Sequence, residues 1–314
     1  MRALASPASL KGVLSAREAA EALAEGMRSA GAEAEELPVA DGGEGTLDVL
    51  HGALGGEWHE VEVYGPQSTD VLARWLMLPG RVAAIESAEA IGLGLVPLEE
   101  RDVMNAWSGG LGELIHNALQ ADAAELIVFL GGTATVDGGI GLLSVLGHLP
   151  VPVRAACDVR AQLLDAVWVF AAQKGATREQ LPELERRLLD NAALEPFRDV
   201  PGGGAAGGLG AALAALGAEL VEGAPLVLEL IGFPGRLRDA DLVITGEGSV
   251  DRSTWLGKAP AAVLSACQEA RVRCVLFGGL VLEQPAGIEV YELSGDPAGA
   301  RDDLIDLGEW VATS

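Results

Sequence analysis

The stretch "AELIVFLGGTATVDGGIG", residues 124–141, decides the fold class of this chain. Five consecutive apolar residues, 126–130, are typical of a strand that is buried on both faces of a parallel sheet. A glycine pair ends this run, a polar turn follows, and a second glycine pair precedes a further apolar segment. The same succession of strand, glycine-rich turn and helix recurs along the chain. We therefore predict α/β architecture with largely parallel sheets, whose ligands bind at the carboxyl ends of the strands.

The spacing of apolar residues places the other elements. Segment 15–27 has helical periodicity and begins with Ser15, three residues before Glu18, which indicates a capping box. Further helices are expected at 109–121 and 177–194, and a buried helix behind a glycine-rich entry loop within 200–218. Strands are expected at 59–65, 71–78, 82–87, 124–132, 151–159, 166–172, 225–230, 240–246 and 273–279.

Length and composition limit the classes of protein to consider. A chain of 314 residues can bury a large core, in two domains or one large domain, and with 4% aromatic residues that core must consist of Ala, Leu, Val and Ile. The net charge of −25 excludes general electrostatic attraction to nucleic acid. The cysteines (Cys157, Cys267 and Cys274) form no CxxC pair, and no apolar run suits a signal peptide or membrane span. We expect a cytoplasmic protein that binds neither nucleic acid nor membrane.

The use of lysine is selective. The sequence has eighteen arginines but only three lysines, Lys11, Lys174 and Lys258, and each lysine is next to a glycine. A forked guanidinium is a poor replacement for a compact ammonium in a phosphate-binding turn. The glycine-rich turns of the chain also carry six carboxylates: Asp41, Glu44, Asp137, Asp158, Glu247 and Asp251. This combination indicates turns that bind a phosphorylated ligand, although any single one of them is compatible with ordinary turn chemistry.

Glycines, carboxylates and isolated cations together suggest Mg²⁺-assisted phosphoryl transfer. Glycines let backbone N–H groups approach a phosphate, and Mg²⁺ can lie between a carboxylate and an anionic ligand. A positioned Asp can take the proton from the attacking hydroxyl. The chain contains no GxxxxGK[ST] motif, and the turn 131–139 does not match GxGxxG. The four histidines show no ligand spacing, so neither a zinc site nor a Ser-His-Asp triad is supported.

Over nearly its whole length the sequence resembles the bacterial type I glycerate kinases. The matching motifs include "PVADGGEGT" (38–46), "LGGTATVDGGIGLLSVLG" (130–147), "QKGAT" (173–177), "GGGAAGGLGAAL" (202–213) and "ADLVITGEGSVDRSTWLGKAP" (240–260). The resemblance implies ATP- and Mg²⁺-dependent phosphorylation of D-glycerate, to 2-phosphoglycerate in most of this type. It also implies two α/β domains flanking a cleft. One is a discontinuous domain of residues 1–62 plus 240–314, and the other is a flavodoxin-like central insertion, 63–239.

On this interpretation each candidate residue has a role. The catalytic candidates are Asp137, Glu247, Asp251 and Lys258. The candidates for binding glycerate are Ser9, Lys11, Asp41 and Glu44. The candidates for binding nucleotide or phosphate are Gly131, Gly132, Thr133, Gly138, Lys174, Gly207 and Gly208. The metal candidates are Asp158, Glu247 and Asp251. The expected partners are therefore the small molecules ATP and glycerate, and a homodimer is left open.

Several positions depart from the pattern of the family. Ala8 and Ser249 stand where the family usually has Asp and Arg, Val136 replaces an Asn, and segment 161–172 lacks the usual Asn-Pro-Leu and Gly-Pro turns. Two alternatives therefore stay open beside a glycerate kinase. One is a non-catalytic relative that binds a nucleotide or a small acid, and the other is a kinase for another small hydroxy acid. The choice between the 2- and 3-hydroxyl and the identity of the catalytic base are also open.

Overall fold

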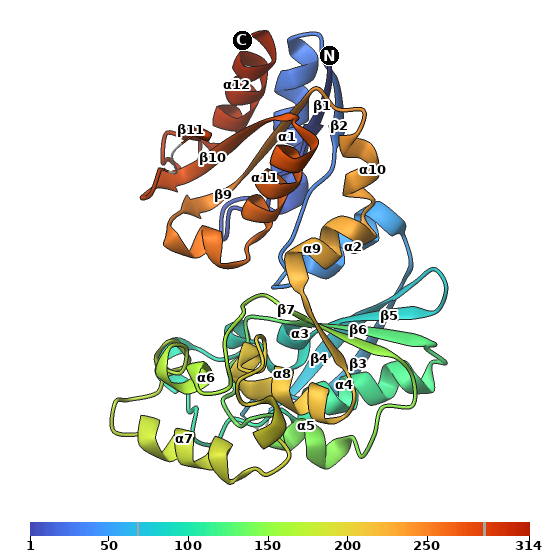
Figure 1. Ribbon diagram of the computed structural model, residues 1–314, viewed down its shortest axis with the longest axis vertical. Helices are drawn as coiled ribbons and strands as arrows, with labels where there is room; N and C mark the ends of the chain where they lie inside the picture. The colour runs from blue at the N-terminus through green and yellow to red at the C-terminus, as the bar shows by residue number, and fades with distance from the viewer. Residues whose placement is uncertain (68, 285–286) are drawn as a thin grey trace. The chain divides into compact units, whose positions relative to one another are not determined.

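A computed structural model describes residues 1–67, 69–284 and 287–314 (Figure 1). The chain folds into two compact units. The chain-end unit comprises residues 1–41, 48–53 and 224–314, and the central unit comprises 42–47 and 54–223. Each unit has its own sheet with helices packed against it, which confirms the predicted α/β class. Within the described ranges, no helix has the length and apolar character needed to cross a membrane.

The sheet of the chain-end unit is parallel throughout, with the strand order β11-β10-β9-β1-β2. Its strands are β1 (Arg2–Ala5), β2 (Glu33–Glu36), β9 (Leu242–Val250), β10 (Arg273–Val281) and β11 (Glu289–Glu292). Taken in chain order within this unit, the arrangement is 2-1-3-4-5, the order of flavodoxin-like sheets. In that topology the strand order reverses between the first and third strands, here β1 and β9, and ligands bind at this switch point.

Alternating side chains of these strands face two different layers of helices. On β10, Val275 and Phe277 belong to the core cluster formed with α1 (Ala16–Ser29) and α12 (Ala300–Thr313), whereas Leu276 between them belongs to a smaller cluster with Leu264 of α11 (Ala259–Ala270). This is the two-residue period expected of a strand buried on both faces. The unit also contains η5 (Arg252–Leu256) and α10 (Phe233–Leu237), and α2 (Thr46–Leu54) and α9 (Gly223–Leu230) lie at its boundaries.

Helices α1 and α12 pack very closely against each other, as Figure 1 shows near the two termini. A Cβ atom on Gly26 of α1 would lie 1.9 Å from the backbone oxygen of Ile305, and one on Gly308 of α12 would lie 2.4 Å from the oxygen of Leu23. The backbones can approach this closely only because both contact positions lack a side chain. Ser15 caps α1 as predicted, since its hydroxyl and backbone N–H both donate to the Glu18 carboxylate and its oxygen accepts from the Glu18 N–H.

The sheet of the central unit is mixed and follows the order of the chain, β3-β4-β5-β6-β7-β8. Its strands are β3 (Glu57–Tyr64), β4 (Asp70–Leu78), β5 (Val82–Glu86), β6 (Glu125–Leu130), β7 (Val153–Cys157) and β8 (Glu219–Glu222). The strands β3, β4 and β5 are antiparallel neighbours, and β5 to β8 are parallel. The helical segments are α3 (Ser87–Ile91), η1 (Leu93–Leu95), η2 (Leu98–Glu100), α4 (Gly109–Gln120), α5 (Ile140–Val145), α6 (Asp165–Trp168), η3 (Ala172–Lys174), α7 (Leu181–Asp190), η4 (Glu195–Phe197) and α8 (Ala205–Ala215).

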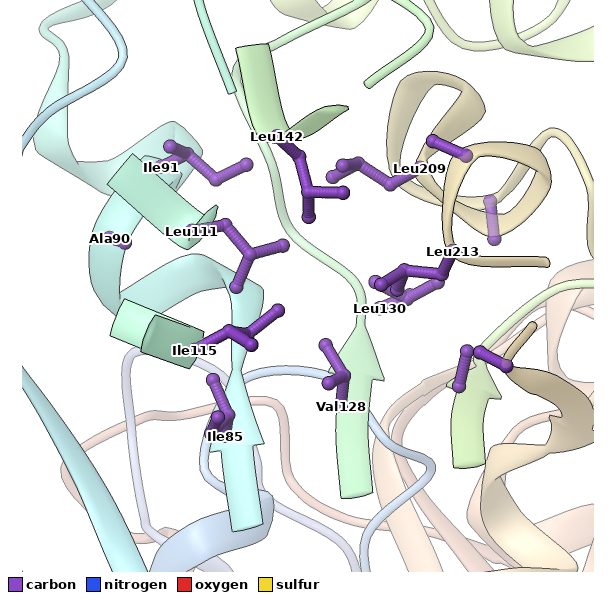
Figure 2. Close-up of a cluster of buried hydrophobic side chains, with 14 of the residues drawn as sticks. Ile85, Ala90, Ile91, Leu111, Ile115, Val128, Leu130, Leu142, Leu209 and Leu213 are labelled. Carbon is purple, nitrogen blue, oxygen red and sulfur yellow. The ribbon is translucent and has the colours of Figure 1, made fainter. Parts of the chain in front are cut away.

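Aliphatic side chains form the core of the central unit, as the low aromatic content predicted. Figure 2 shows Ile85 of β5 and Val128 and Leu130 of β6 facing Leu111 and Ile115 of α4, with side chains of α5 and α8 completing the cluster. The side chains of all five residues are fully buried. Because branched aliphatic side chains interdigitate in few arrangements, this core fixes where β5 and β6 end. Those ends carry the polar residues described below.

The structure corrects three details of the predicted fold. The flavodoxin-like strand order belongs to the chain-end unit, whereas the central sheet keeps chain order. Segments 166–172 and 225–230, expected as strands, are not strands: the first consists of the end of α6, a turn at 169–171 and the start of η3, and the second lies in α9. In the first, Trp168 and Val169 are neighbours and both are exposed, which an alternating half-buried strand would not produce. Short apolar runs do not distinguish a strand from a buried helix.

The borders between the two units also differ from those expected from the resemblance. The predicted border at 62/63 lies inside β3, whose eight residues all belong to the central unit. The predicted border at 239/240 lies after α9 and α10, but the chain returns to the chain-end unit at residue 224. The structure thus has two compact units with borders of its own, and the domain division implied by the resemblance stays a prediction.

Candidate functional site

In the chain-end unit, the loop that follows β1 runs beside the end of β9. The Ser6 N–H donates to the Ile244 carbonyl at 2.8 Å and the Ala8 N–H to the Gly246 carbonyl at 2.9 Å. The Thr245 hydroxyl donates to the Ser6 carbonyl at 2.7 Å. These bonds extend the β1–β9 pairing past the end of β1. The loop after β1 therefore lies at the switch point of the sheet. A ligand at this point would meet residues 6–11 on one side and residues 247–249 on the other.

Glu247 is the buried carboxylate of this region, with an exposed fraction of 8%. Its Oε2 accepts from the Lys258 ammonium at 2.9 Å, and its Oε1 accepts from the Thr254 hydroxyl at 2.7 Å. Lys258 occupies the N-cap position of α11, and its side chain is 30% exposed. Glu247 therefore holds the lysine at the start of the helix while part of that side chain still reaches solvent. Lys258 and Glu247 were both predicted as site residues.

Asp251, a further catalytic and metal candidate, caps the short helix η5. Its Oδ1 accepts from the Ser253 N–H at 2.6 Å, and its own N–H donates to the Thr254 hydroxyl at 3.0 Å. The hydrogen bonds from Ser253, with a smaller contribution from Lys258, lower the pKa of this carboxyl below its usual range. Thr254 thus links the Glu247 carboxylate to the backbone of Asp251, because its hydroxyl accepts from the Asp251 N–H and donates to Glu247. Thr254 was missed by the sequence reasoning, although its place three residues after Asp251 fits a capping box.

The glycerate-binding candidates are divided between the two units. Ser9 is half-buried in the loop after β1, and Lys11 is exposed at the tip of the turn closed by Leu10 and Leu14. Asp41 ends the first segment of the chain-end unit, whereas Glu44 is exposed in the 42–47 segment of the central unit. The structure therefore brings Ser9 and Lys11 to the switch point. The roles of Asp41 and Glu44 stay predictions.

In the central unit, the glycine-rich segment 42–47 is held at the end of β5 by Glu86. This carboxylate is 4% exposed, and it accepts from the Leu47 N–H at 2.7 Å and from the Gly45 N–H at 3.3 Å. Both donors precede or begin α2, so a negative charge sits where helix N–H groups need acceptors. The sequence reasoning missed Glu86. The available signal was its position as the single carboxylate at the end of the apolar run 82–86.

The ends of β5, β6 and β7 bring three predicted turns together. The Ser87 hydroxyl, directly after β5, donates to the Gly131 carbonyl at 3.2 Å and accepts from its N–H at 3.3 Å. A Cβ atom on Gly131 would lie 2.9 Å from Oδ2 of Asp158 and 3.0 Å from the Cα of Gly43. Segment 42–47, the turn 131–139 and the residue after β7 therefore meet at one edge of the central sheet.

Lys174 lies beneath the turn 131–139 and is 4% exposed. Its ammonium donates to the Thr133 hydroxyl at 3.0 Å and to the Thr135 carbonyl at 2.9 Å. Burial lowers the pKa of Lys174 to about 8, and the negative charges of Asp158 and Asp137 oppose that shift. This lysine, predicted as a phosphate ligand, is thus in contact with the turn itself.

Asp137 accepts four hydrogen bonds at the far end of the same turn. Its Oδ2 accepts from the Ser108 hydroxyl at 2.8 Å, the Ser108 N–H at 3.0 Å and the Gly141 N–H at 3.1 Å. Its Oδ1 accepts from the Gly139 N–H at 3.0 Å. The carboxylate thereby supplies acceptors for the first N–H groups of α5 and ties them to the residue before α4. These four bonds favour a structural role for Asp137, and its catalytic role stays a prediction.

The second glycine-rich turn, 202–210, packs directly against the turn 131–139. The Gly138 N–H donates to the Gly207 carbonyl at 3.1 Å. A Cβ atom on Gly207, whose φ is +77°, would lie 2.0 Å from the Thr135 carbonyl oxygen. The helix α8 adopts regular geometry only after the left-handed residues 206–208. The structure shows that Gly207 and Gly208 permit the two turns to touch, and their predicted contact with nucleotide stays a prediction.

The residues predicted to hold a metal do not form a protein-built metal site. Across residues 1–67, 69–284 and 287–314, no three His, Cys, Asp or Glu side chains are grouped so that they could hold a metal ion. Glu247 and Asp251 already accept hydrogen bonds, and Asp158 belongs to the other unit. A Mg²⁺ ion in kinases is commonly bound by one or two carboxylates together with substrate phosphates. That arrangement needs no cluster of three protein side chains, and the metal role of Asp158, Glu247 and Asp251 stays a prediction.

Two parallel-strand edges, each lined by glycine-rich turns with a lysine beside them, are the features of an α/β protein that binds ligands at the carboxyl ends of its strands. Comparison with known proteins identifies it further: the model of the glycerate kinase family matches residues 3–151 and 149–295. The chain belongs to the glycerate kinase family.

Named relatives support the same assignment. The chain is 39% identical to a glycerate kinase of Bacillus subtilis (strain 168), over 90% of this chain and 85% of the relative. It is 36% identical to a glycerate 2-kinase of Escherichia coli (strain K12), over 86% of this chain and 82% of the relative. A crystal structure from Salmonella typhimurium LT2, provisionally assigned as a glycerate kinase 2, superposes with a TM-score of 0.86 at 34% identity, covering 99% of this chain and 97% of the other.

Proposed function

We propose that this protein transfers the γ-phosphoryl group of ATP to D-glycerate and releases ADP and 2-phosphoglycerate. The observation that carries the proposal is the Glu247–Lys258 ion pair at the switch point of the chain-end sheet, in a chain of the glycerate kinase family. An ammonium held in place by a buried carboxylate can stabilise negative charge without reorganising. A phosphoryl transfer requires that kind of support because its transition state carries charge on the transferred oxygens.

Each edge contributes different groups in this proposal. Lys258 neutralises the transferred phosphoryl group, and Ser9 and Lys11 in the neighbouring loop bind the glycerate carboxylate. The backbone N–H groups of the turn 131–139 bind nucleotide phosphate, as glycine-rich turns do at helix starts. Asp251, a carboxylate held by the Ser253 N–H at the start of η5, is our candidate for orienting the attacking hydroxyl. In this proposal ATP binds together with Mg²⁺.

The test is release of ADP in a mixture of protein, ATP, Mg²⁺ and D-glycerate, compared with the same mixture without glycerate. Glycerate-dependent release that disappears in Lys258→Ala supports the proposal. Enolase alone as the coupling enzyme detects 2-phosphoglycerate, whereas 3-phosphoglycerate is detected only after phosphoglycerate mutase is added. Stabilisation by ATP and glycerate without turnover would instead support a non-catalytic binding protein. Turnover with another small hydroxy acid would redirect the substrate assignment.

We also propose a cytoplasmic location, on the basis of the unpaired cysteines, which suit a reducing compartment. All three are free thiols, Cys157 and Cys267 buried and Cys274 half-buried. The oligomeric state is a separate question that sedimentation equilibrium answers directly. A monomer in that measurement would exclude the homodimer, which the sequence left open.

A further inference from the structure

Lys174 of the central unit is a buried cation, and its contacts replace the hydration that its ammonium has lost. An ammonium removed from water loses hydration that only hydrogen bonds and opposite charge can replace. Lys174 finds these in the turn 131–139, through the Thr133 hydroxyl at 3.0 Å and the Thr135 carbonyl at 2.9 Å, and in the field of Asp158 and Asp137. The lysine and the turn therefore stabilise each other, although they are 39 and 41 residues apart in the chain.

The backbone conformation at Lys174 is fixed by its neighbours. It ends the short helix η3, and the next residue, Gly175, has a φ of +98° and turns the chain away. Its N–H donates to the Ala171 carbonyl at 3.0 Å, and Ala171 is fully buried in the core of the unit. A lysine anchored in this way holds its ammonium in a fixed position against Thr133 and Thr135 of the turn 131–139. With 4% of the residue exposed, the ammonium is almost closed off from solvent, so a ligand arriving from solvent has little access to it.

We propose that Lys174 is a positioning residue that acts through Thr133. Its ammonium holds the turn 131–139 in the conformation that binds nucleotide phosphate, and it does not itself contact the phosphate. This inference rests on the proposed function, because it takes this turn as the nucleotide site. It differs from the role expected from the sequence, in which the lysine neutralises phosphate directly.

Two threonines of the same turn form a matched pair for testing the proposal. Thr133 and Thr135 are both buried, with exposed fractions of 2% and 0%. The Thr133 hydroxyl accepts from Lys174, whereas the Thr135 hydroxyl has no hydrogen-bond partner within the described part of the chain. Valine has nearly the same shape as threonine. Thr133→Val therefore removes the link to the lysine, and Thr135→Val removes a hydroxyl but leaves the carbonyl that Lys174 uses.

The experiment measures ATP binding by isothermal titration calorimetry without glycerate, so that the result does not depend on turnover. The variants are Thr133→Val, Thr135→Val, Lys174→Met and the double variant Thr133→Val/Lys174→Met. We expect Thr133→Val and Lys174→Met each to weaken ATP binding about tenfold, the range of one hydrogen bond to a charged group. The double variant should be no weaker than Lys174→Met alone, because the two residues act as one unit. Thr135→Val should weaken ATP binding less than Thr133→Val does, because the hydroxyl it removes makes no hydrogen bond within the described part of the chain.

Steady-state kinetics add a readout that a general loss of stability would not produce. The KM for ATP should rise in Thr133→Val and Lys174→Met, while the KM for glycerate stays within twofold of the wild type. Lys174→Arg keeps the charge and should restore part of the affinity for ATP. If Lys174→Met does not fold, the comparison of Thr133→Val with Thr135→Val still decides the proposal.

Three results would overturn the proposal. If Lys174→Met weakens ATP binding a hundredfold beyond Thr133→Val, and the effects of the two changes multiply in the double variant, the lysine contacts phosphate directly. If Thr133→Val binds ATP like Thr135→Val, the link has no role in binding. If the wild-type protein phosphorylates glycerate and no variant alters the KM for ATP, the nucleotide binds elsewhere and the proposed function stands alone. Absence of turnover in a wild type that binds ATP would contradict the proposed function only.

Discussion

The Lys258 ammonium and the Glu247 carboxylate form an ion pair of 2.9 Å at the carboxyl end of β9. Its two members are separated by eleven positions in the sequence and belong to different elements, β9 and the N-cap of α11. The pair is partly buried, so salt screens the attraction between its charges less than it screens that of a surface pair.

We expect Glu247→Gln to lower kcat about 100-fold with little change in the KM for ATP. The amide keeps the size of the side chain but loses the charge that fixes Lys258, and a charge-stabilising group that is no longer fixed costs about 10²-fold or more in rate. The measurement is steady-state kinetics of ADP release. Glu35→Gln is a matched control, because Glu35 pairs with Arg236 at 2.5 Å in the same unit and outside the proposed site. A kcat of Glu247→Gln within twofold of the wild type would contradict this role.

The pKa of Lys174 predicts how its contribution to stability depends on pH. Burial lowers this pKa from 10.5 to about 8, so between these values the unfolded chain holds a proton that the folded protein has lost. Stability rises with pH wherever the unfolded state binds more protons. The cost of burying the charged lysine is fully present below pH 8 and is relieved as the pH rises toward 10.5.

The comparison that isolates this effect is urea denaturation of wild type and Lys174→Met from pH 7 to pH 10. The free energy of unfolding of the wild type relative to the variant should increase with pH, by on the order of 3 kcal/mol over the full range. Groups other than Lys174 titrate in both proteins and cancel in the difference. A difference that is flat with pH would show that folding leaves the pKa of Lys174 unchanged, and one that falls would show that folding raises it; either result contradicts the prediction.

Gly26→Ala should destabilise the chain-end unit by at least about 3 kcal/mol, because the new methyl group would lie 1.9 Å from the Ile305 carbonyl oxygen and force α1 and α12 apart. The control is Gly52→Ala in α2, where a Cβ atom would meet nothing within 4 Å. That variant should be neutral or more stable by up to about 1 kcal/mol, as expected for alanine in a helix. Thermal or chemical denaturation of both variants checks the pair, and equal effects would contradict the close approach of the helices.

Asp137→Asn should lower the free energy of unfolding by about 1–3 kcal/mol, because an amide group cannot accept from all the donors that now share the carboxylate. Chemical denaturation measures the loss. A structural role predicts that the loss of activity follows the loss of folded protein and is recovered at lower temperature. A fall of 10³-fold in kcat at unchanged stability would instead identify Asp137 as the catalytic base.

The physical origin of each feature explains which ones the sequence could predict. The capping box of Ser15 and Glu18 and the helix behind the 200–208 entry loop depend on neighbours in the chain, and both are present. The segments 166–172 and 225–230 were assigned wrongly, since packing decides between strand and helix for a short apolar run. Glu86 was missed because its partners, Gly45 and Leu47, are 41 and 39 residues away.

The sequence by itself determined the α/β class, the glycine-rich turns and the family, because these follow from local periodicity and from motifs of adjacent residues. Only the tertiary structure decided what the charged residues contact. It brings the Lys174 ammonium into contact with the turn 131–139. It also places N–H donors around the Asp137 carboxylate and pairs Lys258 with Glu247. The partner of a buried charge is set by the packing of distant segments, since the cost of burial has to be met by whichever groups the fold brings within hydrogen-bond reach.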